Sequence, residues 1–598
     1  MVVAIYQKNI EQYNGQLQKC RRYNTTIGWA RLFAIVGAIA LVIWQWPDFD
    51  MFSAVGIFLC VAVFLRLVAI AVDTNSKIRH LKLLIALNEE ELQIAAGQYH
   101  SRYDGGGFAP AVHEYAPDLD LLGRASLYQY TQRVESEPGK RSLAQWLLGR
   151  AGNQEILARQ MAARALANKL EWRQDFQATG RGKAFTATTE EQLRSWQSFP
   201  MGSFEKPFWK ILRWAGPMVS LSFLGAYIGG LIPLSVFNLY LLVFFAATAY
   251  ISKLATPAYN QLGKMAPEIN TLSRLLACIE NMPANDSEWL QQRLHNLQKD
   301  KEVAVSRQVL ELNGILKRMD YRLNPVVFIP LNILFFWDLQ QMIQLTRWQK
   351  NNSHKLDGWM QSLGEMEAIS SISALVYNHA DWAFPVMQDS HGVFEAAALG
   401  HPLIGEKKRV ASDFETRLTP MVNIITGSNM AGKSTFLRSV GLAMVMGQAG
   451  APVCAKTARL SNMQVISSMR IADNLEESTS TFYAELKKLK SMIDAVNEGA
   501  PVFLLMDEIL RGTNSLDRQK GSKALVKQLI HKNAVGMIAT HDLELAEMEK
   551  DYPQAIRNDH FDVQVAGEEL YFDYALKAGV CQSLNASVLM KKIGIQLD

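Results

Sequence analysis

The sequence predicts an α/β P-loop domain at the C-terminus, preceded by an all-α region that carries two transmembrane helical hairpins. The α/β domain is indicated by a short apolar strand that runs through a G-x-x-x-x-G-K-S pattern into a helix, at residues 422–435. The hairpins are indicated by two pairs of apolar runs, at residues 28–72 and 211–252. Between and after these pairs, apolar residues recur at helical spacing, which predicts the all-α region.

The chain has 598 residues, which is long enough for roughly three or four domains. Hydrophobic residues make up 49% of the chain, a high share for a soluble protein, and this favours membrane segments. The formal net charge is only +4, so there is no chain-wide electrostatic signature for nucleic acid and a basic patch would have to be local. The five cysteines are scattered without a C-x-x-C pair, which is typical of reduced thiols and supports no zinc site.

The loop between the C-terminal strand and helix has the spacing of a phosphate-binding loop. Its two glycines allow backbone conformations that turn successive N–H groups toward phosphate oxygens. Lys433 would reach the β- and γ-phosphates, the Ser434 hydroxyl suits Mg²⁺, and the following helix points its positive end at the anion. The weaker alternative is a glycine turn that precedes a helix by chance. The predicted ATP-binding residues are Gly427, Ser428, Asn429, Met430, Ala431, Gly432, Lys433, Ser434 and Thr435.

Two further apolar strands end in residues suited to phosphate chemistry. The run 502–506 is followed by Asp507, which would hold Mg²⁺ through water, and by Glu508, which would polarise the attacking water. Another run ends at Thr540 and is followed by His541, placed to contact the γ-phosphate or its water. Taken singly, these are also explained by acids at a turn and by a surface histidine. The predicted catalytic residues are Lys433, Glu508 and His541, and the predicted metal ligands are Ser434 and Asp507.

The first apolar pair predicts a transmembrane hairpin. Residues 28–46 and 51–72 are apolar apart from Arg31 and Arg66, and each run approaches the ~20 residues needed to cross a ~30 Å hydrocarbon core. The break between the runs is acidic and the outer flanks are basic, so by the positive-inside rule both ends face the cytoplasm. A signal peptide is not expected, since the lead-in is long and has no small-residue cleavage site. The alternative is a helical hairpin buried in a soluble core.

The second pair, residues 214–230 and 231–252, has no charged residue between Arg213 and Lys253 and again has basic flanks. A third apolar patch, residues 326–337, is too short to span and holds proline, so it is expected in the core or at a membrane surface. The chain is therefore predicted to be a multi-pass membrane protein with about four spans. Both termini and the α/β domain would lie in the cytoplasm.

Several sequence blocks resemble MutS-family proteins. Residues 118–128 and the run P-G-K-R-S-L-A-Q-W-L at 138–147 are similar to the opening of the MutS helical core, or lever, domain. Without the family, the second block is a helix start with proline in its first turn. Residues 359–375 resemble the connector from that core to the ATPase.

Residues 287–320, charged on one face, are expected to form one long helix, packed along one side or paired in a coiled coil.

The C-terminal domain carries the more specific resemblance. Residues 480–486 read S-T-F-Y-A-E-L, which is an ordinary helix start in isolation and is similar to the MutS S-T-F signature in this context. The loop 511–517 would cross to a partner subunit, and the stretch 401–594 as a whole is similar to the ABC-type MutS ATPase domain. The L-S-G-G-Q signature of ABC transporters is absent. The resemblance implies ATP and Mg²⁺ as cofactors and a homodimer in which Ser480 acts catalytically in trans, on ATP bound by the opposite subunit.

The sequence also departs from the family pattern. Ala431 and Leu510 stand where glycines are usual, which leaves the functional groups in place but could alter turnover. Residues 1–116 show no mismatch-reading domain and no F-x-E motif, so a role in mismatch recognition is not expected. DNA therefore stays a partner by family resemblance only, whereas the lipid bilayer is an expected partner from the apolar hairpins.

The sequence thus predicts a membrane-anchored MutS-like ATPase whose nucleotide state moves its core and hairpins. One alternative is a DNA-binding MutS relative tethered to the membrane, active in mismatch repair or another DNA transaction, and a second is an ATP-gated scaffold with little turnover. The expected segments are a cytoplasmic N-terminal segment (1–27), the first hairpin (28–72), a linker helix and loop (73–116), the first part of the helical core (117–210), the second hairpin (211–252), the second part of the core with the connector (253–400), and the ATPase domain (401–598).

Overall fold

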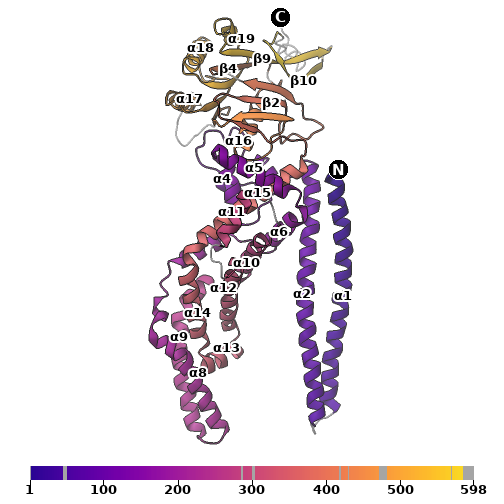
Figure 1. Cartoon of the computed structure of the whole chain (residues 1–598), viewed down its shortest axis with the longest axis vertical. Coiled ribbons are helices and arrows are strands. Elements are labelled where there is room, and N and C mark those ends of the chain that lie inside the picture. The colour runs from indigo at the N-terminus through magenta and orange to yellow at the C-terminus, as the bar shows by residue number, and fades with distance from the viewer. Residues whose placement is uncertain are drawn as a thin grey trace.

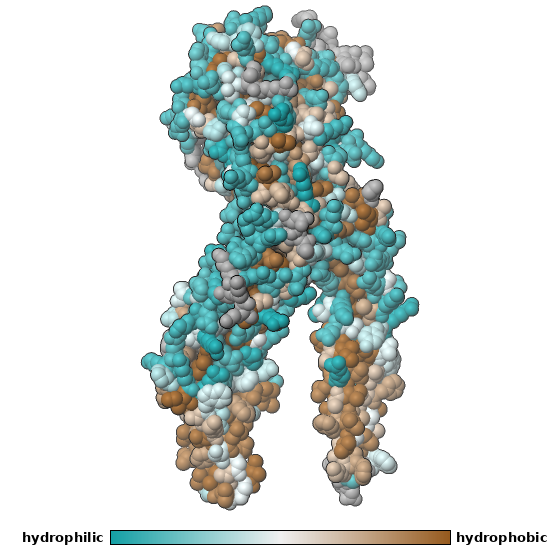
Figure 2. Space-filling model, viewed as in Figure 1, coloured by the Kyte–Doolittle hydropathy of each residue, from teal (hydrophilic) through white to brown (hydrophobic). Residues whose placement is uncertain are grey.

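The computed structural model describes residues 2–44, 50–283, 287–298, 303–416, 419–428, 430–470, 481–566 and 569–582. The molecule is elongated, with an α/β domain at one end, a helical region below it, and two helical arms that extend away from the α/β domain (Figure 1). Both arms end in apolar surface, and these two surfaces lie at the same end of the molecule (Figure 2).

The first arm is a hairpin of two long helices, α1 (Val2–Trp44) and α2 (Met51–Ala95). The helices have 43 and 45 residues, so at 1.5 Å per residue each is about 65 Å long, twice the thickness of a hydrocarbon core. The predicted spans 28–46 and 51–72 therefore occupy only the outer half of the arm. The inner half is polar and packs on the helical region through α6 (Leu170–Gly182).

The second arm contains α8 (Pro207–Ile228) and α9 (Leu234–Leu262), which continues through a short 3₁₀ turn, η3 (Gly263–Met265), into α10 (Ala266–Glu280). A short helix, α13 (Pro325–Phe335), packs against both α8 and α9. Among the described residues, four helical segments are long and apolar enough to cross a membrane: Val2–Trp44, Met51–Ala95, Pro207–Ile228 and Leu234–Glu280.

The remaining helices build the region between the arms and the α/β domain. They are η1 (Gly106–Phe108), α3 (Leu127–Thr131), α4 (Glu137–Leu148), α5 (Asn153–Ala167), α7 (Ala187–Gln197), η2 (Gly202–Glu205), α11 (Glu288–Leu297), α12 (Val305–Met319), η4 (Asp320–Leu323), α14 (Trp337–Asn352), η5 (Ser353–Lys355) and α15 (Leu356–Asn378). Helix α15 is buried along most of its length, with α4, α5 and α11 packed around it. It leads directly into the α/β domain, which makes it the structural link between the two regions (Figure 1).

The prediction of one long helix over residues 287–320 is wrong. The structure has two helices there, α11 and α12, and α11 ends at Leu297. Helix α11 packs on α5 and α15, whereas α12 packs on α10 and α14. Both helices are amphipathic, because each buries an apolar face on its own neighbours. The helical spacing of apolar residues is therefore present in α11 and in α12, and it does not reveal that the two are separate helices.

The α/β domain is built on a mixed sheet in the order β10-β9-β4-β8-β7-β6. Its strands are β4 (Met421–Thr426), β6 (Gln464–Ser468), β7 (Val502–Asp507), β8 (Val535–Thr540), β9 (Ile556–Ala566) and β10 (Glu569–Ala578). The strands from β9 to β6 run parallel to their neighbours, and β10 is antiparallel to β9. A second sheet, in the order β1-β5-β2-β3, contains β1 (Val386–Gln388), β2 (Phe394–Leu399), β3 (Ser412–Thr416) and β5 (Thr457–Ser461).

Helices cover both faces of the larger sheet. Helix α16 (Lys433–Gln448) packs with Phe503 and Leu505 on one face, in the core that continues into the helical region. Helices α17 (Thr481–Asn497) and α18 (Ser515–His531) pack with the alternate residues Leu504 and Met506 on the other face. The short helices α19 (Leu543–Ala546) and η7 (Glu547–Lys550) join β8 to β9. Because β4, β7 and β8 are parallel neighbours, their carboxyl ends meet at one edge.

Candidate nucleotide site

The phosphate-loop sequence connects β4 to the N-terminus of α16, so its backbone lies at the carboxyl edge of the sheet. Gly427 and Gly432 have φ angles of +146° and +108°, which side chains rarely tolerate. A Cβ at Gly427 would also lie 2.7 Å from the Phe561 carbonyl oxygen. The two glycines of the motif are therefore required by the shape of this loop.

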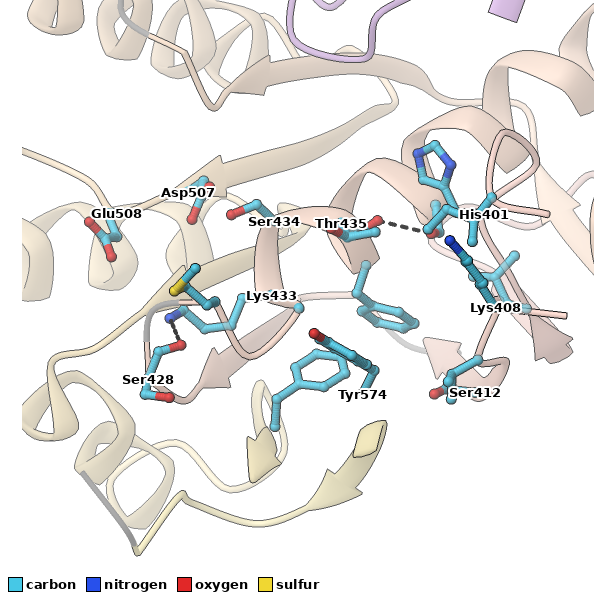
Figure 3. Close-up of a pocket in the computed structure, with 18 of the residues that line it drawn as sticks. His401, Lys408, Ser412, Ser428, Lys433, Ser434, Thr435, Asp507, Glu508 and Tyr574 are labelled. Atoms are coloured by element: carbon cyan, nitrogen blue, oxygen red, sulfur yellow. Dashed lines mark hydrogen bonds between the residues drawn. The ribbon is translucent and has the colours of Figure 1, made fainter. Parts of the chain in front are cut away.

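Lys433 folds back over the loop that precedes it. Its Nζ donates a hydrogen bond to the Ser428 carbonyl oxygen at 3.0 Å (Figure 3) and another to the Gly427 carbonyl oxygen at 2.7 Å. Burial lowers the pKa of Lys433, while the nearby carboxylates of Glu508 and Asp507 act in the opposite direction. The ammonium group is thus held at the mouth of the loop by weak neutral acceptors, which phosphate oxygens could replace.

The acids and the histidine predicted after two other strands meet at the same edge. Asp507 ends β7, and the backbone N–H of Glu508 donates to the Ala539 carbonyl of neighbouring β8 at 2.8 Å. His541 follows β8, and its Nδ1 lies 3.2 Å from Oε1 of Glu508. A histidine that bonds a carboxylate in this way fixes the orientation of that carboxylate.

Arg511 is a further charged group at this position. Its guanidinium lies 3.7 Å from a carboxylate oxygen of Asp507 and 3.4 Å from one of Glu508. It also donates hydrogen bonds to the backbone carbonyls of both residues, at 2.7 Å and 3.1 Å. The side chain therefore neutralises the two acids from the solvent side.

These groups border a cleft of 650 Å³, which is a size suited to a nucleotide. Lys433, Ser434, Asp507 and Glu508 line it, whereas His541 reaches it only through Glu508. Thr435, at the start of α16, lines it as well. Sequence reasoning therefore located the half of the cleft around the phosphate loop.

The other half of the cleft was missed. It is lined by His401, Lys408, Ser412 and Tyr574. In Figure 3 the first three lie to the right of Lys433, and Tyr574 lies beside the phosphate loop. These residues come from the segment before β3, from β3 itself and from β10. They carry no shared local pattern, so the sequence held no signal for them. Burial lowers the pKa of His401 to about 4, which keeps this imidazole neutral.

The donor atoms of the cleft suit a small hard cation. Asp507 and Ser434 both line it and offer oxygen ligands, the type that Mg²⁺ prefers. Within the described part of the chain, no group of three or more His, Cys, Asp or Glu residues is arranged to hold a metal by itself. Proteins usually bind Mg²⁺ through one or two groups together with substrate phosphates and water.

The remaining predicted positions are the variable residues of the phosphate loop, the signature serine, and the residue at position 510. Asn429 and Ser480 lie outside the described residues. Met430 is exposed with a φ of +73°, and Ala431 is buried without a positive φ, so alanine fits where a glycine is usual. Leu510, the other departure, has a φ of +59°, a conformation that glycine would adopt more easily.

The C-terminal domain is similar in sequence to known proteins. Residues 423–592 match the family model for MutS domain V. The chain is 30% identical over 221 residues to the DNA mismatch repair protein MutS of Aquifex pyrophilus, covering 36% of this chain and 25% of that protein. It is 31% identical over 237 residues to that of Thermotoga petrophila, covering 39% of this chain and 29% of the relative.

The MutS protein of Persephonella marina is similar in the same way, with 28% identity over 248 residues, 41% of this chain and 28% of the relative. The chain thus spans between a quarter and a third of the length of these relatives. These matches confirm the resemblance of the C-terminal part of the chain to MutS-family proteins, and residues 423–592 are similar to MutS domain V.

Proposed function

We propose that the chain is a membrane-anchored MutS-like ATPase, which binds ATP and Mg²⁺ in the cleft at the carboxyl edge of its larger sheet and hydrolyses the γ-phosphate. The observation that carries this proposal is the convergence of Lys433, Ser434, Asp507 and Glu508 on one cleft beside a phosphate-loop sequence. The match of residues 423–592 to MutS domain V supports the same reaction.

In the proposed reaction each group has one task. Lys433 exchanges its two loop carbonyls for phosphate oxygens, which positions the nucleotide. Glu508 orients and polarises the attacking water, and His541 holds the Glu508 carboxylate in place. Asp507 and Ser434 would hold Mg²⁺, which neutralises phosphate charge when bound. Arg511 has to leave the two acids for this to occur, since its guanidinium competes for them.

By resemblance to the family, the working unit is a homodimer whose ATP sites are completed in trans by Ser480. Closure of the dimer on ATP would change the angle between the two helical regions and so between their arms. The membrane is the proposed location because each arm ends in exposed apolar helices of spanning length. The phosphate-loop domain lies at the opposite end of the molecule (Figure 1). We propose that this end faces the cytoplasm, because the apolar runs have basic flanks.

The test is ATP hydrolysis by the full chain reconstituted in lipid vesicles, with Glu508→Gln as the variant. We expect Glu508→Gln to lose hydrolysis by roughly 10²-fold or more while still binding ATP, since the general base is removed and the phosphate loop is not. Glu498→Gln, an exposed acid after α17, is the matched control and should retain activity. Equal, near-zero turnover in the wild type and Glu508→Gln would instead support an ATP-gated scaffold.

A second candidate function, DNA binding, is favoured by the similarity to proteins named as DNA mismatch repair proteins. Its measurement is DNA affinity as a function of salt with ATP present, because the slope counts the phosphates contacted. Absence of binding at low salt would remove this candidate and leave the ATPase proposal intact.

A further inference from the structure

A third apolar helix lies beside the two spans of the second arm. Helix α13 packs one face against α8 and α9, and its other face is exposed. Val326 is 82% exposed and Val327 and Ile329 are each more than 40% exposed, and Leu323, just before the helix, is 74% exposed. This surface is continuous with the apolar surface of α8 and α9, which carries Trp214 and Leu242 on its outside.

Helix α13 is too short to cross a membrane by itself, and it is sharply bent from the helices that follow it. Its 11 residues are about 16 Å long, roughly half of a hydrocarbon core. Its axis is bent by 79° from the helical stretch that follows, Trp337–Asn378. Phe336 forms the corner in a left-handed conformation with a φ of +51°. Since the following helices run along the arm toward the α/β domain, α13 lies across the arm (Figure 1).

Side chains of neighbouring helices hydrogen-bond backbone groups at the junction of α13 and α14. The Ser220 hydroxyl of α8 donates to the Ile333 carbonyl oxygen at 3.1 Å, and Ser220 is itself bonded to the Tyr240 hydroxyl of α9. The Asp338 backbone N–H donates to Oδ1 of Asn332 at 3.1 Å. A helix end in hydrocarbon requires such partners, because lipid offers none.

The charged groups next to α13 are paired on its protein side. Arg322 forms a two-pronged pair with Asp338, at 2.8 Å and 2.7 Å, and Asp338 is only 1% exposed. Asn332 joins this cluster by donating to the Ser252 hydroxyl of α9 at 3.0 Å. The cluster ties α13 to α9 and α14 at the inner border of the apolar zone. This charged pair is thus kept away from the exposed apolar face, which is what contact with lipid requires.

We infer that α13 is an in-plane membrane helix, whose exposed face lies among the acyl chains of the leaflet nearest the α/β domain. This inference rests on the proposed membrane anchoring. The second arm would then contact the membrane through two spans and one half-inserted helix, whereas the first arm has two helices only. The two spans fix how deeply the second arm is inserted in the bilayer. A helix that lies across them opposes tilting of the arm relative to the membrane.

The test is the accessibility of a nitroxide side chain to two paramagnetic relaxation agents, dissolved oxygen and a nickel chelate. The nitroxide is introduced as a single non-natural amino acid in the full chain. The chain is placed in vesicles of phosphatidylethanolamine and phosphatidylglycerol. Position 326 reports on α13, position 242 in α9 reports on the proposed anchoring, and position 112, 91% exposed in the helical region, is the matched aqueous control. Dissolved oxygen concentrates in hydrocarbon, whereas a nickel chelate stays in water.

We expect oxygen to exceed the nickel chelate at positions 326 and 242, with the order reversed at position 112. If position 326 resembles position 112 while position 242 resembles lipid, the inference about α13 fails and the anchoring stands. If positions 326 and 242 both resemble water, the proposed anchoring itself fails. Protection of position 326 from both relaxation agents would show that a second copy or another protein covers this face, and this also overturns the inference.

Discussion

In the turn after β7, two residues other than glycine have a left-handed backbone conformation. Glu508 and Leu510 have φ angles of +55° and +59°, and the Leu510 N–H is bonded to Glu485 of α17. The left-handed conformation costs a residue with a Cβ about 1–2 kcal/mol relative to glycine. This cost is tolerated here because the turn aims the Glu508 carboxylate at the cleft.

Leu510 allows this cost to be measured. Leu510→Ala and Leu510→Gly both remove the buried side chain beyond Cβ, so the difference between their free energies of unfolding reports the backbone conformation together with one methyl group. We expect Leu510→Gly to be more stable than Leu510→Ala by about 1 kcal/mol, measured by denaturant unfolding in detergent micelles. Ala431→Gly is the control, because Ala431 has no positive φ, and it should destabilise the domain. Greater stability of Leu510→Ala would refute the strain at this turn.

A second prediction at the residue scale concerns pH. Glu367 of α15 is fully buried, and burial raises its pKa to about 7 despite hydrogen bonds from Ser136 and the Glu135 backbone. Between pH 4.5 and 7 the folded chain therefore binds a proton that the unfolded chain has released. Stability is thus fully present below pH 4.5 and falls by about 3 kcal/mol as the pH rises to 7 and above.

Glu367→Gln, which is neutral at every pH, should flatten this slope. The measurement is the unfolding temperature of the full chain at pH 5 and pH 8. We expect the variant to match the wild type at pH 5 and to exceed it at pH 8. A smaller slope should remain, because burial also raises the pKa of Glu135. If the unfolding temperature of Glu367→Gln differs between pH 5 and pH 8 as much as that of the wild type, Glu367 is not the source of the pH dependence.

At the scale of elements, the contact between α4 and α15 depends on glycines. A Cβ at Gly139 of α4 would lie within 3 Å of the Glu367 side chain, and one at Gly364 of α15 would lie 2.6 Å from the Pro138 carbonyl oxygen. Helix α4 begins at Glu137, is capped by Ser136 and has Pro138 in its first turn, and the sequence predicts this proline in the first turn. The two helices approach closely only because these positions have no side chain.

Two glycines on the same helix should therefore respond in opposite ways to alanine. Gly364→Ala forces α4 and α15 apart and should destabilise the chain by about 1–3 kcal/mol. Gly358→Ala meets no atom within 4 Å and should stabilise α15 by about 0.5–1 kcal/mol, since alanine is the better helix former. Unfolding of both variants in detergent measures the difference. Equal effects would mean that the close approach of the helices does not limit stability.

The elements also show how far sequence reasoning reaches. Lys433, Asp507 and Glu508 could be located because each lies in a local motif at a strand end, and parallel strands bring their ends together. His401 and Tyr574 could not, because they meet across the cleft only after distant segments have folded together. The apolar runs indicated where spans lie, yet they gave no sign that α1 and α2 continue far beyond them.

At the scale of the whole molecule, the two arms have to fit one bilayer. Each arm is anchored separately on the helical region, and their apolar ends lie side by side at the same end (Figure 2). An exposed apolar zone stays in water only at a large free-energy cost, at about 25 cal/mol per Å². Both zones are therefore expected in the same membrane, with the tips of both arms on the side opposite the α/β domain.

Cysteine labelling in intact cells with a membrane-impermeant maleimide tests this arrangement. Met51→Cys at the tip of the first arm and Leu231→Cys at the tip of the second are both highly exposed positions, at 83% and 80%. We expect both to be labelled from outside, beyond the labelling of the parent chain with its five native cysteines. Val112→Cys should be labelled only after permeabilisation. Labelling of one tip alone would mean that only that arm crosses. Labelling of Val112→Cys but of neither tip in intact cells would mean that the topology is the inverse of the one that the basic flanks predict.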